Sequence, residues 1–154
     1  MEYRIEHLDF ALRIVGKRKS VKTSKAFKAV PILWDHAKKD GFMEALIHMA
    51  WENPKCTLES ILGVCEKKAT IKDEQFDYFM GVRYDGEAPG DMETLVIPPS
   101  LWAVFPNVVD AWKRLYSEWL PTSGYALADL PCIECYYDPK HNPRSELWVP
   151  ITLK

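Results

Sequence analysis

The sequence predicts an α+β fold, in which duplicated strand–helix–strand–strand units form an antiparallel sheet with helices on one side and a central cleft suited to a ligand. The main observation is the order of the patterns along the chain: strand, helix, strand, strand, and then the same order again. The 154 residues, 47% of them hydrophobic, suffice for one domain with a substantial core. We therefore predict a single domain over residues 1–154, with similar halves at about 8–84 and 92–152.

The first half opens with a predicted strand at residues 10–19 and a helix. Pro31 fits the first turn of a helix better than its middle, so we expect the helix to begin near Val30. It should end at Gly41, because glycine readily adopts the left-handed conformation that closes helices. A second short helix is indicated by apolar residues at helical spacing: Phe42, Ala45, Leu46 and Met49.

Two strands complete this half, at residues 61–66 and 76–84, and the polar residues 67–74 join them. In the second of these strands, Tyr78 should share a face with Phe76 and Met80, because side chains alternate along a strand. Asp77 and Phe79 should point to the opposite face.

The second half repeats the order. Residues 94–97 and 101–105 are predicted to be extended, and a helix should run from an N-cap at Asn107 to Leu120. Pro121 and Gly124 then end that helix. The last strands are expected at residues 130–137 and 146–151.

Charge argues against a direct nucleic-acid partner, because the formal net charge is −2. The charge is uneven, with nine Lys or Arg residues between positions 13 and 39 and Asp35 as the single acidic residue there. Such a cluster is most often a solvated surface, and it is also the candidate contact surface if a protein partner exists.

Neither a membrane span nor a secretion signal is expected. No apolar stretch approaches the roughly 20 residues that cross a bilayer, and the start of the chain lacks the apolar core of a signal peptide. A cytoplasmic location follows as an expectation, and the four cysteines (Cys56, Cys65, Cys132 and Cys135) should then stay reduced.

A lone carboxylate in an apolar strand is the most informative feature of the chain. It lies in the run Pro131-Cys132-Ile133-Glu134-Cys135. A strand interior withholds the water that would solvate Glu134, so such a residue is expected to bind something cationic. By alternation Cys132, Glu134 and Tyr136 share one face. The residue pattern alone leaves open an edge strand with Glu134 in solvent.

Five short motifs resemble the GyrI-like effector-binding domain in their order and spacing. They are Phe79-Met80-Gly81-Val82, Ile97-Pro98 with Leu101-Trp102-Ala103-Val104-Phe105, Glu118-Trp119-Leu120-Pro121-Thr122-Ser123-Gly124-Tyr125, Glu134-Cys135-Tyr136, and Leu147-Trp148-Val149-Pro150-Ile151. The likeness covers residues 76–151 well and residues 8–66 loosely. It implies a duplicated strand–helix–strand–strand fold with a small-molecule cleft, and Glu134 as the family's central glutamate.

The resemblance also implies several roles. Members of the family form the drug-sensing half of transcription regulators or occur alone, and some stand-alone members are hydrolases of cyclopropane-bearing alkylators or protect DNA gyrase. This sequence shows no helix-turn-helix segment, so gene regulation would need a DNA-binding partner chain.

Aromatic residues are the candidates for the cleft walls, because flat rings stack on flat ligands and attract cations. We predict that the ligand contacts Glu134 and this aromatic set: Tyr78, Trp102, Trp119, Tyr136 and Tyr137. Trp119 is included because family members line the cleft there. Four others are assigned to the core: Trp34, Trp51, Trp112 and Tyr116.

No metal or cofactor is expected. Cys132 and Cys135 are three residues apart in a strand, so their thiols should face opposite sides and cannot share an ion. The chain also lacks a glycine-rich phosphate loop and a recognisable nucleophile elbow.

Three functions remain open. The first is binding of small lipophilic, often cationic, organic compounds by Glu134 and the aromatic residues. The second is hydrolysis of a strained ring such as a cyclopropane, with Glu134 activating water and Tyr78 polarising or protonating the substrate. The third is contact with a protein partner or a second copy of the chain.

Overall fold

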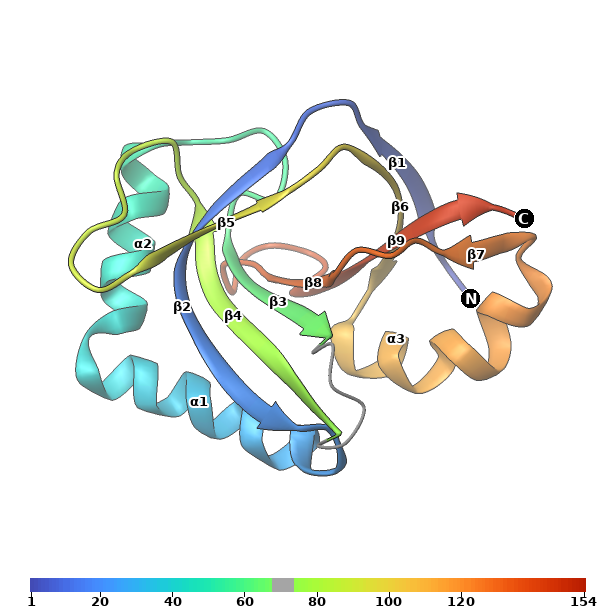
Figure 1. Cartoon of the computed structure of the whole chain (residues 1–154), viewed down its shortest axis with the longest axis horizontal. Helices are drawn as coiled ribbons and strands as arrows, with labels where there is room; N and C mark the ends of the chain where they lie inside the picture. The colour runs from blue at the N-terminus through green and yellow to red at the C-terminus, as the bar shows by residue number, and fades with distance from the viewer. Residues whose placement is uncertain (68–73) are drawn as a thin grey trace.

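A computed structural model describes residues 1–67 and 74–154 (Figure 1). Three α-helices lie in these ranges: α1 (Ala26–Asp40), α2 (Phe42–Glu52) and α3 (Val108–Arg114). The strands are β1 (Arg4–Leu8), β2 (Leu12–Lys22), β3 (Ile61–Lys67), β4 (Gln75–Arg83), β5 (Glu93–Ile97), β6 (Ser100–Pro106), β7 (Tyr125–Leu127), β8 (Cys132–Tyr136) and β9 (Ser145–Leu153). The predicted linker at residues 67–74 lies largely outside the described residues.

All the strands join one antiparallel sheet in the order β1-β6-β9-β8-β3-β4-β2-β5, and β7 pairs with β9. The pairing of β3 with β8 connects the two ends of the sheet, and it sets Gly63 opposite Glu134. Each half of the chain supplies an edge strand to the other end: β1 pairs with β6, and β5 pairs with β2. The predicted α+β fold with a single antiparallel sheet is therefore confirmed.

The helices cover one face of the sheet. Helices α1 and α2 pack on β2 and β4 through residues such as Val15, Leu46 and Met80, while α3 packs on β6 and β9 through Ala111 and Leu115. Figure 1 shows that α1 and α3 are separate helices, which lie on either side of the end of β3.

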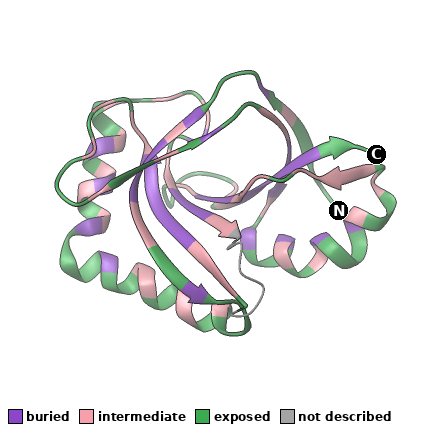
Figure 2. Ribbon diagram, in the orientation of Figure 1, coloured by how far each residue is buried: buried purple, intermediate pink, exposed green. Residues whose placement is uncertain are grey.

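The other face of the sheet curls around its own core. Side chains from both ends meet there, including Leu8, Ile14, Phe79, Trp102 and Trp148. Figure 2 shows buried positions along the strands, while the outer surfaces of the helices are exposed. Burial on both faces explains why central strands such as β4 are apolar almost throughout.

Helix α1 begins earlier than predicted. It starts at Ala26 after a short 3₁₀ turn, so Pro31 lies inside the helix rather than in its first turn. Proline interrupts helix hydrogen bonding, but Ala26, Ala29 and Val30 pack against the sheet, and this burial favours helix before the proline. The helix ends as predicted at Gly41, which has a left-handed φ of 87°.

Two strands were not predicted from the sequence. Most of β1 is exposed and β7 has only three residues, so neither carries the alternating apolar pattern that identifies a strand.

The predicted helix of the second half is α3, continued by a π-helical turn at Leu115–Trp119 and a 3₁₀ turn at Leu120–Thr122. Asn107 occupies the N-cap position without a side-chain cap; the Oγ of Ser145 instead accepts the Val108 N–H. No helix in the described ranges is long and apolar enough to cross a membrane.

Candidate functional site

A cavity of about 610 Å³ opens on the helical face of the sheet, and residues of α1 and α3 both line it. Its walls come from α1, α3 and the ends of β3, β4 and β8. The lining is mainly apolar and includes Phe27, Val30, Phe76, Val109, Trp112 and Tyr116. Several of these residues are partly or largely exposed, including Phe27 and Tyr116, so the cavity is open to ligands from solvent.

Glu134 lies at the floor of this cavity, on β8, with only 6% of its surface exposed. Its Oε1 accepts hydrogen bonds from the hydroxyls of Tyr78 (2.7 Å) and Tyr136 (2.8 Å). Its Oε2 accepts a hydrogen bond from Trp112 Nε1 at 2.7 Å. All three donors are neutral, and none of the described residues forms an ion pair with Glu134. The carboxylate is therefore hydrogen-bonded without a countercharge from that part of the chain.

Gly63 makes this arrangement possible. It lies on β3 between Tyr78 on β4 and Glu134 on β8, and it pairs directly with Glu134. A Cβ at this position would lie 1.9 Å from the Tyr78 hydroxyl oxygen, which is far inside contact distance. The absence of a side chain lets the phenol cross β3 and reach the carboxylate.

The Tyr78 hydroxyl is held from two sides. It donates to Glu134 and accepts a hydrogen bond from Trp34 Nε1 at 2.9 Å. Burial, and then the nearby negative charge of Glu134, raise the pKa of Tyr78 well above its ordinary value. The same two causes raise the pKa of Tyr136. Both phenols therefore remain protonated donors at neutral pH.

Of the six residues predicted to bind ligand, the structure brings Glu134, Tyr78 and Tyr136 together in the cavity. Trp102 and Tyr137 lie on the opposite face of the sheet, because strand alternation turns them away from it. Trp119 packs instead against Phe105 and Tyr125 in the core below α3. Trp119 is the last residue of the wider π-helical turn, which changes the helical repeat, so its side chain does not continue the face of Trp112 and Tyr116.

The assignment of Tyr116 to the core was wrong, because this residue is 51% exposed, whereas Trp112 does pack against the core on one side. Both line the cavity, and Trp112 contacts Glu134 directly. The core face of α3 is already filled by Val108, Ala111 and Leu115, so two rings spaced i, i+4 beside that face could have indicated a cavity wall.

The other two core assignments have different outcomes. Trp34 is partly buried, packs against the core between the sheet and helices α1 and α2, and contacts the rings of Tyr78 and Tyr136, so its assignment agrees with the structure. Trp51 is 72% exposed on α2, so its assignment to the core was wrong.

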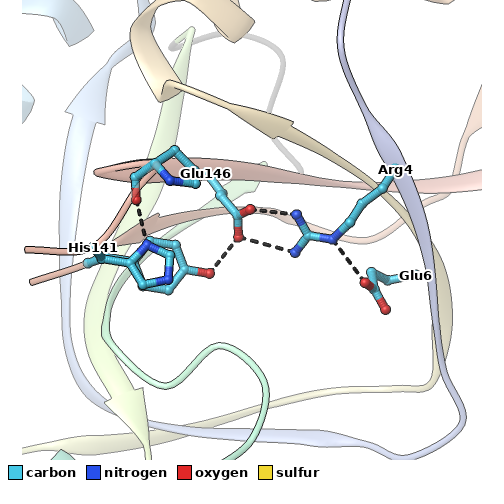
Figure 3. Close-up of polar contacts among 6 residues, drawn as sticks. Arg4, Glu6, His141 and Glu146 are labelled. Carbon is cyan, nitrogen blue, oxygen red and sulfur yellow. Dashed lines mark hydrogen bonds and ion pairs between the residues drawn. The ribbon is translucent and has the colours of Figure 1, made fainter.

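A second buried carboxylate, Glu146 on β9, has a different environment (Figure 3). Arg4 donates to it through both terminal nitrogens, at 2.6 and 3.3 Å, and the Tyr137 hydroxyl donates to Oε1. Burial alone would raise the pKa of Glu146, but the hydrogen bonds from Arg4 and Tyr137 outweigh it and hold that pKa below its ordinary value. This residue is neutralised within the protein.

The cysteines follow the predicted alternation. Cys132 lines the cavity, while Cys135 is buried in the core on the opposite face. The side chain of Cys65 on β3 also lines the cavity, opposite Cys132 in the strand pairing.

Comparison with known proteins identifies the family. The model of the GyrI-like small molecule binding domain matches residues 1–152. The chain belongs to this family. The resemblance predicted from the sequence is thereby confirmed, and small-molecule binding is the function that the family indicates.

Individual relatives are distant. A DNA gyrase inhibitor from Erwinia billingiae is 24% identical over 136 residues, which cover 77% of this chain and 84% of that protein. The structure of SAV2435 bound to tetraphenylphosphonium aligns with a TM-score of 0.82 at 20% identity, over 99% of this chain and 94% of that one. The C-terminal domain of EcmrR aligns with a TM-score of 0.56 at 17% identity, over 99% and 98% of the two chains. These structures share the fold.

Proposed function

We propose that this protein binds organic cations that carry aromatic or other apolar groups, and that Glu134 supplies the countercharge. The observation that carries the proposal is the environment of Glu134: a buried carboxylate, open to a cavity, with only neutral hydrogen-bond donors among the described residues. A buried charge is costly unless it is paired, so a cationic ligand would complete the site.

The cavity suits a ligand of drug-like size. Its volume of about 610 Å³ falls within the roughly 300–1,000 Å³ typical of small-molecule sites. Phe27, Trp112 and Tyr116 offer ring faces and edges to an apolar body, and aromatic faces attract cations as well. A compact, strongly hydrated cation would lose much hydration on entry, whereas a cation shielded by apolar groups would lose little.

The structural relatives support this choice of ligand. SAV2435, which has the same fold, was solved with tetraphenylphosphonium, a cation shielded by four aromatic rings. The same compound is therefore a suitable first probe for this protein.

The test is to measure tetraphenylphosphonium binding by titration calorimetry in wild-type protein and in Glu134→Gln, which keeps the shape but removes the charge. Two unit charges about 5 Å apart at an effective dielectric constant of about 20 interact by about 3 kcal/mol, so affinity should fall roughly a hundredfold. Neutral triphenylphosphine oxide should lose much less.

Glu146→Gln is the matched control, because Glu146 is equally buried but lies away from the cavity. Under conditions in which Glu146→Gln is folded, it should bind tetraphenylphosphonium with the affinity of the wild type. Equal losses for the cation and the neutral compound in Glu134→Gln would contradict the proposed role of the charge.

Hydrolysis is a second candidate, favoured by the 2.7 Å contact between Tyr78 and Glu134 in the cavity. This pair places a protonated phenol beside a carboxylate that can accept a proton from water. The test is to incubate the protein with a cyclopropane-bearing alkylator and follow product by mass spectrometry. Product beyond one equivalent per protein, lost in both Glu134→Gln and Tyr78→Phe, would establish turnover; product limited to one equivalent would reject it.

A further inference from the structure

Two thiols lie side by side on the cavity wall. Cys65 on β3 and Cys132 on β8 are direct partners in the antiparallel pairing, and both line the cavity. Directly opposed residues on one face of an antiparallel pair have Cβ atoms about 4.5–5.5 Å apart. Neither residue is in a disulfide, and both are only partly buried. The strands thus hold two thiols on the cavity wall at a separation that one bridging atom can span.

The surroundings of this pair are aromatic. Cys65 is also the register partner of Tyr78 on β4, and Tyr116 faces the same cavity from the helical side. The ring of Tyr116 therefore lines the same cavity as the two thiols. A ligand joined to the thiols would therefore place its substituent against these rings.

We propose that Cys65 and Cys132 form a two-thiol site that captures trivalent organic arsenicals carrying an aromatic group. The reaction is a condensation: R–As=O plus two thiols gives R–As(S–Cys)₂ plus water. Two As–S bonds form, the arsenic–oxygen bond breaks, and both thiol protons leave on the oxygen as water. Arsenic remains trivalent and sulfur keeps its oxidation state, so neither an oxidant nor a reductant is needed. The inference depends on the cavity and its thiols, and not on the charge of Glu134.

The protonation of Cys65 favours this ligand class over metal ions. Burial, and then the negative charge of Glu134, raise the pKa of Cys65 well above its ordinary value, so it remains a thiol at neutral pH. Zinc requires thiolates and usually three or four protein ligands. An arsenic(III) oxide reacts with two neutral thiols and leaves no net charge in an apolar site, which suits this wall of the cavity.

The strand pairing should also strengthen the complex. After one As–S bond forms, the second thiol is already in place, and linkage of this kind raises affinity by roughly 10²–10⁴-fold over a single attachment. The arsenical should therefore survive an excess of a monothiol such as glutathione but be released by a dithiol such as dithiothreitol.

The experiment uses phenylarsine oxide and the wild-type chain. Intact-mass measurement in excess glutathione should show one arsenical per chain, with a mass increase equal to phenylarsine oxide less one water. Proteolysis under the same conditions should yield the peptides containing Cys65 and Cys132 joined through arsenic. Two arsenicals per chain, a retained adduct on Cys56, or no adduct that survives glutathione would each overturn the proposal.

Variants provide an independent test. Cys65→Ser and Cys132→Ser, shown to be folded by circular dichroism, should each weaken retention by at least about a hundredfold. Cys56→Ser is the matched control, because Cys56 is exposed and outside the cavity, and it should retain the arsenical fully. Phenylarsine oxide should bind more tightly than methylarsine oxide, and equal retention of the two would refute the part played by the aromatic wall.

Failure of this proposal and failure of the proposed function are distinguishable in the wild-type protein. Capture of the arsenical without tetraphenylphosphonium binding would refute the cation-binding function alone. Cation binding without arsenical capture would refute the two-thiol site alone.

Discussion

Two buried glutamates on neighbouring strands have opposite electrostatic environments. Glu134 on β8 and Glu146 on β9 are 6% and 4% exposed, and they face opposite sides of the sheet. Arg4 neutralises Glu146 (Figure 3), whereas the described partners of Glu134 are two phenols and an indole. Burial of a carboxylate therefore does not by itself mark a binding site. The informative feature is a buried carboxylate that opens on a cavity without a countercharge from the described residues.

The two environments also imply different roles. The Arg4–Glu146 pair joins β1 to the centre of the sheet, so its loss should reduce stability and leave ligand binding intact. The network around Glu134 orients a charge toward the cavity, so its loss should affect ligand binding more than folding.

Gly63→Ala should disrupt the Glu134 network most strongly. The new methyl group would overlap the Tyr78 hydroxyl and ring, and must displace the phenol from Glu134. Overpacking of this kind costs roughly 1–3 kcal/mol of stability, measurable by urea unfolding. Affinity for tetraphenylphosphonium should also fall, because the displaced phenol no longer orients Glu134 and must move within the cavity that the ligand would occupy.

Gly90→Ala is the control for this change. The space around Gly90 is open, and its φ of 57° makes alanine cost only about 1–2 kcal/mol of backbone strain. Ligand affinity should not change. Wild-type affinity in Gly63→Ala would show that Tyr78 is not needed to shape the site.

Arg4→Met should destabilise the protein without weakening the ligand. It leaves the Glu146 carboxylate buried and without its cation, a change that costs roughly 3–5 kcal/mol in fully buried pairs. The Arg4 side chain is 49% exposed, so we expect about 2 kcal/mol, measured by urea unfolding at neutral pH. A loss of tetraphenylphosphonium affinity in the folded variant would contradict the separation of the two glutamates.

The ion pair between Arg4 and Glu146 should make the free energy of unfolding depend on pH. The folded-state pKa of Glu146 is lowered from its ordinary value of 4.5, so its stabilising contribution is present above pH 4.5 and is lost as pH falls through the folded-state pKa. The stability gap between wild type and Arg4→Met should therefore narrow below pH 4.5. A gap that is constant with pH would show that Glu146 is not the group coupled to Arg4.

Trp112→Phe should have the smallest effect. It keeps a ring in the cavity wall but removes the indole donor to Glu134 Oε2. A hydrogen bond of this kind contributes about 1 kcal/mol, so tetraphenylphosphonium affinity should fall by about fivefold in calorimetry. Trp51→Phe is the matched control, because Trp51 is 72% exposed on α2, and its affinity should equal that of the wild type.

Strand periodicity predicted the central part of the site. Because side chains alternate along a strand, the sequence placed Glu134 with Tyr136 on one face of β8, and Tyr78 with Met80 on one face of β4. Both placements agree with the structure. Gly41 correctly predicted the end of α1, and the apolar spacing after it correctly predicted α2. Both signals are local in the sequence, so neither depends on contacts with distant residues.

The features of the fold and the site that the sequence did not predict depend on contacts between residues far apart in the chain. The sequence gives no sign that β3 pairs with β8, which is the pairing that sets Gly63 opposite Glu134 and Cys65 opposite Cys132. Trp102 was misplaced because both faces of the sheet are buried, so an apolar strand does not reveal which face meets the cavity. Edge strand β1 was missed because its stability comes from pairing with β6, and not from its own pattern.

The central claim is that the charge of Glu134 selects cations, and a pair of ions matched in size tests it most directly. Tetraphenylphosphonium and tetraphenylborate are similar in shape and opposite in charge, so the ratio of their affinities isolates the electrostatic contribution. We predict that the wild type strongly prefers the phosphonium and that Glu134→Gln reduces this ratio by at least a hundredfold. An affinity ratio that is the same in both proteins would contradict the account.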